Sequence, residues 1–206
     1  NTALNVTERQ IFDKVAVCVG HYAIPDMPTE KEYPGIDKVR KAKLIHSRDI
    51  KDCRNLKDRT ICMLGAGFSA EDIGQMAAKF GAKHIHMCSR KPWFMHKGWP
   101  ENVTFHTGLK EIVPIESDDG MTFGEEIHLT DGTIIRDVDD IIFATGYQCT
   151  FPFMHSDIAM NDMKRHMLNY QLYKTVLMPG NPNVAYIGMQ KNIVFTMSDV
   201  QARMVA

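Results

Sequence analysis

The sequence has almost no excess of charge and no long apolar run. Its 24 lysines and arginines stand against 25 aspartates and glutamates, which gives a formal net charge of −1 at pH 7. Such a balance provides no general attraction to nucleic acid or to an anionic membrane. Nothing approaches the roughly 18 consecutive apolar residues that a membrane-spanning helix needs. The totals therefore predict no nucleic-acid partner and no transmembrane segment in this chain.

The sequence also lacks a C-x-x-C pair. Its cysteines are odd in number and scattered: Cys18, Cys53, Cys62, Cys88 and Cys149. This usage is typical of a reduced, cytoplasmic protein whose cysteines are small core residues. The absence of a C-x-x-C pair also argues against a pyridine nucleotide–disulfide reductase, which needs a redox-active dithiol. His84 and His86 share a strand face, but no cysteine or carboxylate stands at ligand spacing beside them, so no metal site is predicted.

Residues 59–89 combine two strand-like segments with a helical one. RTICMLG (59–65) and HIHMCS (84–89) are short apolar strands. Between them, apolar residues at helical spacing predict a helix over 68–80 with one buried face: Ile73, Met76, Ala77 and Phe80. Gly81 is placed to end this helix. Strand, glycine turn, helix and strand form a βαβ unit, which predicts an α/β fold with a Rossmann-like parallel sheet.

Further strand-like segments surround this unit. They cover residues 11–19, 43–45, 103–117, 125–137, 139–143 and 181–189, and a helix starts near 196. Asp131-Gly132 predicts a type I′ β-hairpin inserted into the α/β domain. After residue 150 the chain becomes polar and methionine-rich, and the methionines of 154–167 are more typical of a core than of a pocket.

The run Gly65-Ala66-Gly67-Phe68-Ser69-Ala70 fits the pattern G-x-G-x-x-A. In a dinucleotide-binding loop the first glycine makes the turn out of the strand, and the second lets the backbone approach a pyrophosphate. Ala70 then keeps the helix close to the sheet. The unpaired N–H groups at the helix start face the phosphates, and the Ser69 hydroxyl can add a further contact. The alternative is a tight strand–helix turn that needs glycine only for packing.

Two carboxylates follow this loop, near the place where a phosphate would lie. Glu71 and Asp72 fall in the first turns of the predicted helix, where negative side chains interact favourably with the helix dipole. Helical geometry can direct them away from the anion-binding face. We interpret them as helix-start residues; the alternative is a hydrogen bond to a ribose or to a neighbouring loop.

The end of the second strand indicates which dinucleotide is bound. An aspartate or glutamate there would bind the ribose 2′-hydroxyl of NAD, but the sequence has Ser89-Arg90-Lys91. Cationic side chains can pair with the 2′-phosphate of NADP(H). The sequence therefore favours NADP(H), the alternative being that Arg90 and Lys91 lie in an ordinary solvated loop.

A second glycine turn follows the apolar strand at 141–143. Thr145 and Gly146 in IIFATGY mark a point where the backbone can pass close to a ligand or to another chain segment. This signal is weak by itself, and it gains weight from the loop at 65–70.

Together these segments resemble the flavin-containing monooxygenases, a family of class B flavoprotein monooxygenases. VAVCVGHYAIPDMP resembles the segment that leaves the flavin domain, and YPGIDKVRKAKLIHSRDIKD resembles the family identifier. GAGFSAEDI resembles the NADPH loop, and IIFATGY the linker back toward the flavin domain. WPEN and NPNVAYIGMQ are most similar to the soluble trimethylamine-oxidising branch. The resemblance covers nearly the whole chain, in family order.

The sequence departs from the family pattern in two respects. In the identifier, expected aromatic and glycine positions fall on Arg40, Ala42 and Ile50, although His46 is kept. The first G-x-G-x-x-G, which holds FAD, is expected upstream of residue 1. The resemblance therefore implies three segments: 1–40 as the end of a flavin-domain segment with a linker, 41–148 as the NADP(H) domain, and 149–206 as an incomplete return toward the flavin domain.

The resemblance implies an FAD- and NADPH-dependent monooxygenase. In such an enzyme a flavin hydroperoxide formed with O₂ oxygenates the nitrogen or sulfur of a small amine or sulfide. Gln190 matches a position that contacts the flavin, the alternative being an ordinary polar residue after a strand. No residue is assigned as a catalytic acid, base or nucleophile. A Baeyer–Villiger or N-hydroxylating flavoenzyme, a flavin-free NADP-binding module without turnover, and a homodimeric state stay open.

Overall fold

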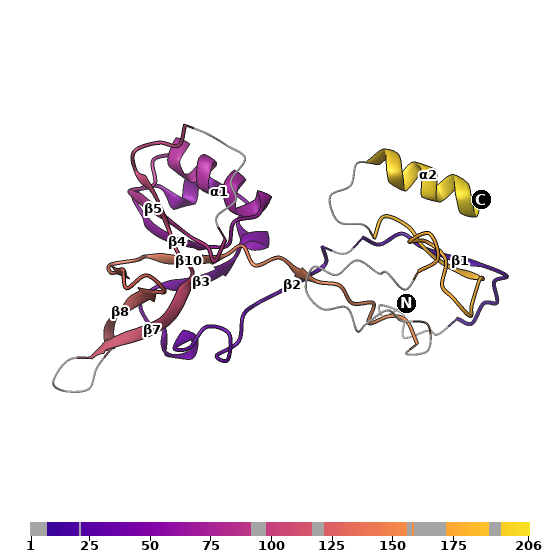
Figure 1. Cartoon of the computed structure of the whole chain (residues 1–206), viewed down its shortest axis with the longest axis horizontal. Helices are drawn as coiled ribbons and strands as arrows, with labels where there is room; N and C mark the ends of the chain where they lie inside the picture. The colour runs from indigo at the N-terminus through magenta and orange to yellow at the C-terminus, as the bar shows by residue number, and fades with distance from the viewer. Residues whose placement is uncertain are drawn as a thin grey trace. The chain divides into compact units, whose positions relative to one another are not determined.

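A computed structural model describes residues 8–20, 22–91, 98–116, 122–155, 158, 172–189 and 195–206. The chain divides into two compact units (Figure 1). One unit is continuous and runs from Pro25 to Gly146. The other combines residues 1–24 with residues 147–206.

A five-stranded parallel sheet forms the centre of the continuous unit, in the order β3-β10-β4-β5-β6. Its strands are β3 (Lys43–His46), β4 (Thr60–Leu64), β5 (His84–Cys88), β6 (Val103–His106) and β10 (Asp140–Phe143). Strands β4 and β10 are buried along their whole length, as expected for internal strands covered on both faces. The predicted α/β fold with a Rossmann-like parallel sheet is confirmed.

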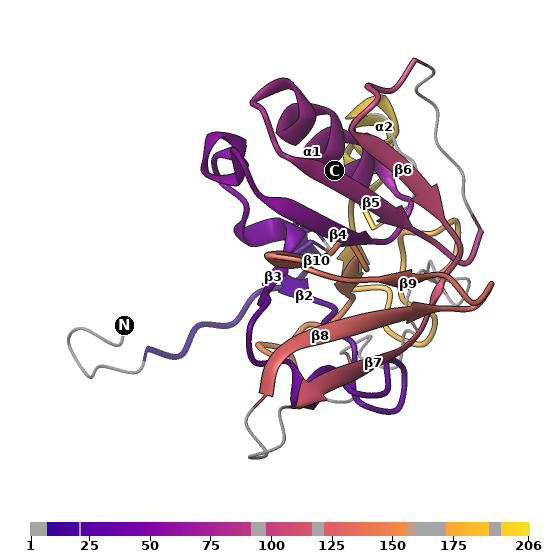
Figure 2. The same ribbon diagram turned by 90° about the vertical axis from the view of Figure 1, so that its left-hand side faces the viewer.

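Helix α1 (Phe68–Lys79) covers one face of this sheet (Figure 2). It ends in a Schellman motif, because Gly81 has φ +87° and the N–H groups of Gly81 and Ala82 donate to Ala78 and Ala77. The helix and its end are therefore confirmed. The predicted buried stripe is confirmed only in part. Ala77 is buried and Ile73 packs against the core, but the other buried positions are Ala70, Glu71 and Gly74, and Met76 is 39% exposed. Small residues let the helix lie close to the sheet, so the larger side chains move to the flanks.

Three antiparallel strands cover the opposite face: β7 (Leu109–Glu116), β8 (Thr122–Leu129) and β9 (Ile134–Ile135). Their apolar side chains and those of the sheet share one core, which includes Leu109, Ile112, Ile127, Ile141 and Phe143. The predicted β8–β9 hairpin is confirmed, but its turn is not type I′. Of the two central residues only Gly132 has a positive φ, whereas a type I′ turn requires it at both.

Residues 25–40 belong to the same unit, which places its start earlier than the predicted boundary at residue 41. The 3₁₀ helix η1 (Ile36–Lys38) buries Ile36 and is followed by the buried Val39. The backbone N–H of Ile112 in β7 donates to the carbonyl of Pro34 at 2.7 Å. This segment therefore packs against the antiparallel strands instead of acting as a free linker. Two more 3₁₀ helices, η2 (Ser47–Asp49) and η3 (Cys53–Leu56), follow β3.

The second unit has little regular structure among its described residues. Strand β1 (Val15–Val17) pairs in parallel with β12 (Val184–Tyr186), and β2 (Ile24–Pro25) pairs with β11 (Tyr147–Gln148). Its core gathers Val17, Phe151, Leu172, Val184, Tyr186 and Met189. Helix α2 (Phe195–Val205) confirms the helix predicted near 196. The strand predicted over 11–19 is shorter than expected: it covers only Val15–Val17, the residues that pair with β12.

Three sequence-based expectations have mixed outcomes. Cys62 and Cys88 are buried core residues as expected, but Cys18 is exposed. Gln190 and most of the methionine-rich segment 154–167 lie outside the described residues. Within the described part of the chain, neither helix has the length and apolar character to cross a bilayer.

Candidate functional site

The carboxyl ends of the five parallel strands meet at one edge of the sheet. Gly65 follows β4, Ser89 follows β5, Gly108 comes two residues after β6, and Ala144 follows β10. Strand β5 lies on one side of β4 and β10 on the other, so the strand order reverses beside β4. Open α/β sheets bind their ligands at such a switch point, outside the carboxyl ends of the strands. The structure thus brings three segments singled out in the sequence to the expected binding edge.

Gly65 is a glycine because the fold requires one. Its φ is +131°, a backbone conformation that other residues rarely adopt. A Cβ at this position would lie 2.4 Å from the carbonyl oxygen of Ala144. The Gly65 N–H also donates to the carbonyl of Cys88 at 3.0 Å, which ties the turn to β5. The turn out of β4 therefore has no space for any side chain.

Gly67 differs, because nothing in the described structure requires a glycine there. It occupies the N-cap of α1 with φ −89° and ψ 178°, an extended conformation open to every residue. A Cβ at Gly67 would meet no atom of the described residues within 4 Å. The space in front of this residue is therefore open to a ligand, and a dinucleotide pyrophosphate that approaches the backbone would account for the missing side chain.

The start of α1 has the features of an anion-binding end. The N-cap residue is a glycine, so no side chain caps the helix. Phe68 and Ser69 are exposed, whereas Ala70 is fully buried against Ile61 and Met63. The positive end of the helix dipole thus faces the carboxyl edge of the sheet.

The two carboxylates at the helix start separate in the structure. Asp72 is exposed, while Glu71 is only 7% exposed and lies on the buried stripe of α1. Glu71 also falls in the first turn, where a negative side chain interacts favourably with the helix dipole. The positions of Glu71 and Asp72 are both compatible with their interpretation as residues that favour the start of the helix.

Ser89, Arg90 and Lys91 form a turn at the end of β5. Ser89 is buried, donates its backbone N–H to the carbonyl of His106, and accepts the N–H of Lys91 on its hydroxyl at 3.3 Å. Arg90 and Lys91 are exposed. The serine therefore anchors a turn that presents two cations at the carboxyl edge.

Thr145 and Gly146 use their polar groups within the protein. The Thr145 hydroxyl donates to the carbonyl of Asp26 at 2.6 Å. The carbonyl of Gly146 accepts the N–H of Asp26 at 2.9 Å and a hydrogen bond from Nε2 of His46 at 2.9 Å. Gly146 has φ +91°, so a glycine suits this turn. These hydrogen bonds join the segment after β10 to Asp26, which follows β2, and to His46 at the end of β3.

His46 connects two motifs that lie 100 residues apart. Its ring is buried, and Nδ1 accepts the backbone N–H of Arg48 at 3.1 Å. Nε2 must therefore carry the hydrogen that is donated to Gly146. Burial lowers the pKa of His46, and the hydrogen bond to Gly146 partly offsets this. Sequence reasoning kept His46 as part of the family identifier but gave it no role.

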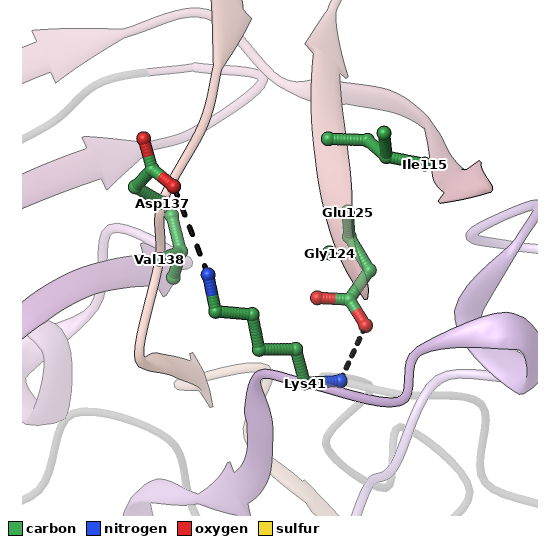
Figure 3. A pocket seen from close by; sticks show the side chains of 6 residues that line it. All are labelled: Lys41, Ile115, Gly124, Glu125, Asp137 and Val138. Atoms are coloured by element: carbon green, nitrogen blue, oxygen red, sulfur yellow. Dashed lines mark hydrogen bonds and ion pairs between the residues drawn. The ribbon is translucent and has the colours of Figure 1, made fainter. Parts of the chain in front are cut away.

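A small hollow in this unit is not the candidate site. Figure 3 shows the side chains that line it, among them Lys41, Glu125 and Asp137. Its volume is about 60 Å³. The buried carboxylate of Glu125 accepts the backbone N–H groups of Arg40, Lys41 and Ala42, the last two at 2.6 and 3.2 Å. These hydrogen bonds join the residues that precede β3 to β8. The hollow itself is too small for a dinucleotide.

Comparisons with known proteins agree on one family. The profile of the flavin-binding monooxygenase-like proteins matches residues 3–122 and 120–206. A trimethylamine monooxygenase from Roseovarius nubinhibens is 34% identical over 203 residues, which are 98% of this chain and 42% of that protein.

Two solved structures are also similar. The crystal structure of Tmm from Pelagibacter sp. strain HTCC7211 has a TM-score of 0.75 at 30% identity, covering 93% of this chain and 40% of that one. The S-allyl-L-cysteine S-oxygenase from Allium sativum has a TM-score of 0.72 at 28% identity, covering 94% of this chain and 42% of that one. The chain thus spans about two fifths of the length of these relatives.

Proposed function

This chain belongs to the flavin-binding monooxygenase-like family, and on that premise we propose that its residues 25–146 bind NADP(H) for an FAD-dependent monooxygenase. The observation that carries the proposal is the open space in front of Gly67. Neither the backbone conformation of Gly67 nor its described neighbours require a glycine, whereas a bound pyrophosphate would. The uncapped start of α1 supplies N–H groups and a positive dipole end for the phosphates.

The preference for NADP(H) over NAD(H) rests on the turn after β5. In place of an acidic residue for the ribose 2′-hydroxyl, this turn presents Arg90 and Lys91 to solvent. Their charges suit the 2′-phosphate that only NADP(H) carries. In this proposal Ser69 and Phe68 flank the pyrophosphate, and Ser89 holds the turn in place.

In the proposed enzyme, bound FAD would supply the redox and oxygen-transfer chemistry, which no protein side chain can provide. This chain's contribution is to hold NADP(H) at the carboxyl edge of the sheet. We place the flavin-domain segments in residues 1–24 and 147–206, with Gln190 as a flavin contact and Thr145 and Gly146 near the cofactors. The hydrogen bonds of Thr145 to Asp26 and of Gly146 to His46 would then order the chain beside the site.

We propose small amines or sulfides as the substrates, together with O₂. The relatives include a trimethylamine monooxygenase, a thiol-specific monooxygenase from Saccharomyces cerevisiae and the Allium S-oxygenase, which together indicate soft nitrogen or sulfur. Product analysis tests this assignment: N-oxides or S-oxides support it, and esters formed from ketones would overturn it. A purified chain that stays colourless with added FAD, yet binds NADP⁺, would identify a flavin-free binding module instead.

A Gly67→Val variant tests the binding site directly. The branched side chain fills the space in which the pyrophosphate would lie, so we expect the variant to lose NADP⁺ binding in calorimetry. Its thermal stability without ligand should fall only modestly, because the backbone of Gly67 is extended and a Cβ there would meet no described atom within 4 Å, although valine is a poorer N-cap residue than glycine. Unchanged NADP⁺ affinity would mean that the loop serves only the fold.

A further inference from the structure

Gly108 is a buried glycine for which the backbone gives no reason. It lies two residues after β6, and its φ is outside the left-handed region that favours glycine. Its carbonyl accepts the N–H of Thr130 at 2.9 Å, a bond that any residue could make. The absence of a side chain must therefore be explained by a neighbour.

That neighbour is Arg90. A Cβ on Gly108 would lie 2.8 Å from Cγ of Arg90 and 3.4 Å from its Cα and backbone nitrogen. Strand pairing explains the approach, because Cys88 in β5 is in register with His106 in β6, and each of the two residues in question lies two positions further on. The stem of Arg90 thus lies in the position that a side chain at 108 would occupy.

The guanidinium of Arg90 is available at the end of this seated stem. Arg90 is exposed, and the structure gives its side chain no hydrogen bond or ion pair with any described residue. Arginine side chains lose considerable rotamer freedom when they bind a ligand, and a stem that is already seated loses less. The missing side chain at Gly108 therefore favours ligand binding by Arg90, although Gly108 itself does not contact the ligand.

We propose that Gly108 is a positioning residue for recognition of the 2′-phosphate: by lacking a side chain, it seats the Arg90 stem so that the guanidinium faces the phosphate on the adenosine ribose. This inference rests on the proposed function, since it deepens the role of Arg90 in NADP(H) binding. Part of the cofactor specificity then comes from the turn after β6, although Gly108 has no side chain that could contact the phosphate.

The test compares two probes on the full chain, adenosine 2′,5′-bisphosphate and ADP, by calorimetry at one ionic strength. Loss of a charge-assisted contact in Arg90→Ala should weaken the bisphosphate about 10- to 100-fold and ADP by less than about twofold. Gly108→Ala should weaken the bisphosphate about fivefold, by displacing Arg90, and leave ADP unchanged. Gly124→Ala is the matched control, because its Cβ would meet only Ile115 Cδ1 and Lys41 Cδ, at 3.6 and 3.9 Å.

The double variant Arg90→Ala, Gly108→Ala separates positioning from general damage. Truncating Arg90 removes the Cγ that the new Cβ would strike, so the second substitution should cause no further loss of the bisphosphate. In thermal unfolding, Gly108→Ala should destabilise the wild-type background more than the Arg90→Ala background. This stability comparison holds even if Gly108→Ala alone folds poorly.

Three results would overturn the inference, and they are distinguishable. If Gly108→Ala keeps wild-type selectivity while Arg90→Ala loses it, Gly108 has no positioning role and the proposed function stands. If Arg90→Ala weakens both probes equally, Arg90 does not read the 2′-phosphate. If the wild type binds the two probes equally, the NADP(H) preference itself is wrong.

Discussion

Gly65 and Gly67 stand two residues apart and are glycines for different physical reasons. At Gly65 the positive φ and the carbonyl of Ala144 leave no room for a side chain, so the glycine serves the fold. At Gly67 both constraints are absent among the described residues, so the glycine is free to serve a ligand. The G-x-G-x-x-A pattern predicted the turn for the first glycine and the approach to a pyrophosphate for the second, but it could not show the carbonyl of Ala144 that excludes a side chain at Gly65.

Alanine substitutions should separate the two glycines. Gly65→Ala forces strain and a backbone clash, so we expect it to lower the free energy of unfolding by about 2–4 kcal/mol. Gly67→Ala should change this free energy by less than about 1 kcal/mol. Urea unfolding of both variants measures the difference, and equal destabilisation would contradict the assignment of Gly65 to the fold.

Three histidines on the β5–β6 edge should make the stability depend on pH. Nδ1 of His86 lies 3.0 Å from Nε2 of His106, and the rings of His84 and His86 are 4.4 Å apart. Burial, followed by positive charge on His84 and His106, lowers the pKa of His86 to about 4. The unfolded chain binds this proton near pH 6.5 and the folded chain only near pH 4. The contribution of His86 to stability is therefore present above pH 6.5 and is lost as the pH falls toward 4.

A His86→Gln variant checks this dependence. We expect the wild type to lose free energy of unfolding between pH 7 and pH 5, and the variant to lose less over the same interval. Urea unfolding at the two pH values measures both. The same loss in the two proteins would show that other groups account for the acid sensitivity.

At the scale of elements, Glu125 has a larger structural role than its surface-type chemistry suggests. Its buried carboxylate in β8 accepts three backbone N–H groups from the residues that lead into β3. Glu125→Ala leaves these donors without partners, and we expect a loss of about 2–4 kcal/mol in the free energy of unfolding. Glu125→Gln keeps one acceptor oxygen and should lose less. Glu116→Ala, at an exposed position in β7, is the control. An equal loss of free energy of unfolding in this variant would contradict the structural role of the Glu125 hydrogen bonds.

The elements that sequence reasoning predicted well are those with local signals. Strands β4 and β5, helix α1 and the Schellman glycine Gly81 follow from apolar spacing and glycine placement over some 30 residues. The contacts it missed join residues far apart: Glu125 with residues 40–42, and His46 with Gly146. Such hydrogen bonds leave no periodic pattern. The one hint in the sequence was His46 itself, which is kept from the family identifier in IHSRDIKD.

At the scale of the whole molecule, the proposed binding edge belongs to one compact unit. All of the segments proposed to contact NADP(H) between Gly65 and Gly146 lie within residues 25–146. The sequence predicted the glycine loop and the cationic turn, but not that Gly108 would accommodate the Arg90 stem, because only strand register places those two residues together. The site residues themselves stay predictions until a cofactor is bound.

The dissociation constants of NADP⁺ and NAD⁺ for the full chain, measured by calorimetry at one ionic strength, test the central claim most directly. Since only NADP⁺ can pair with Arg90 and Lys91 through a 2′-phosphate, we expect it to bind about 10- to 100-fold more tightly than NAD⁺. Arg90→Ala should bring the two constants close together by weakening NADP⁺ alone. Equal constants for the wild type, or no binding of either dinucleotide, would contradict the assignment of this unit as an NADP(H) site.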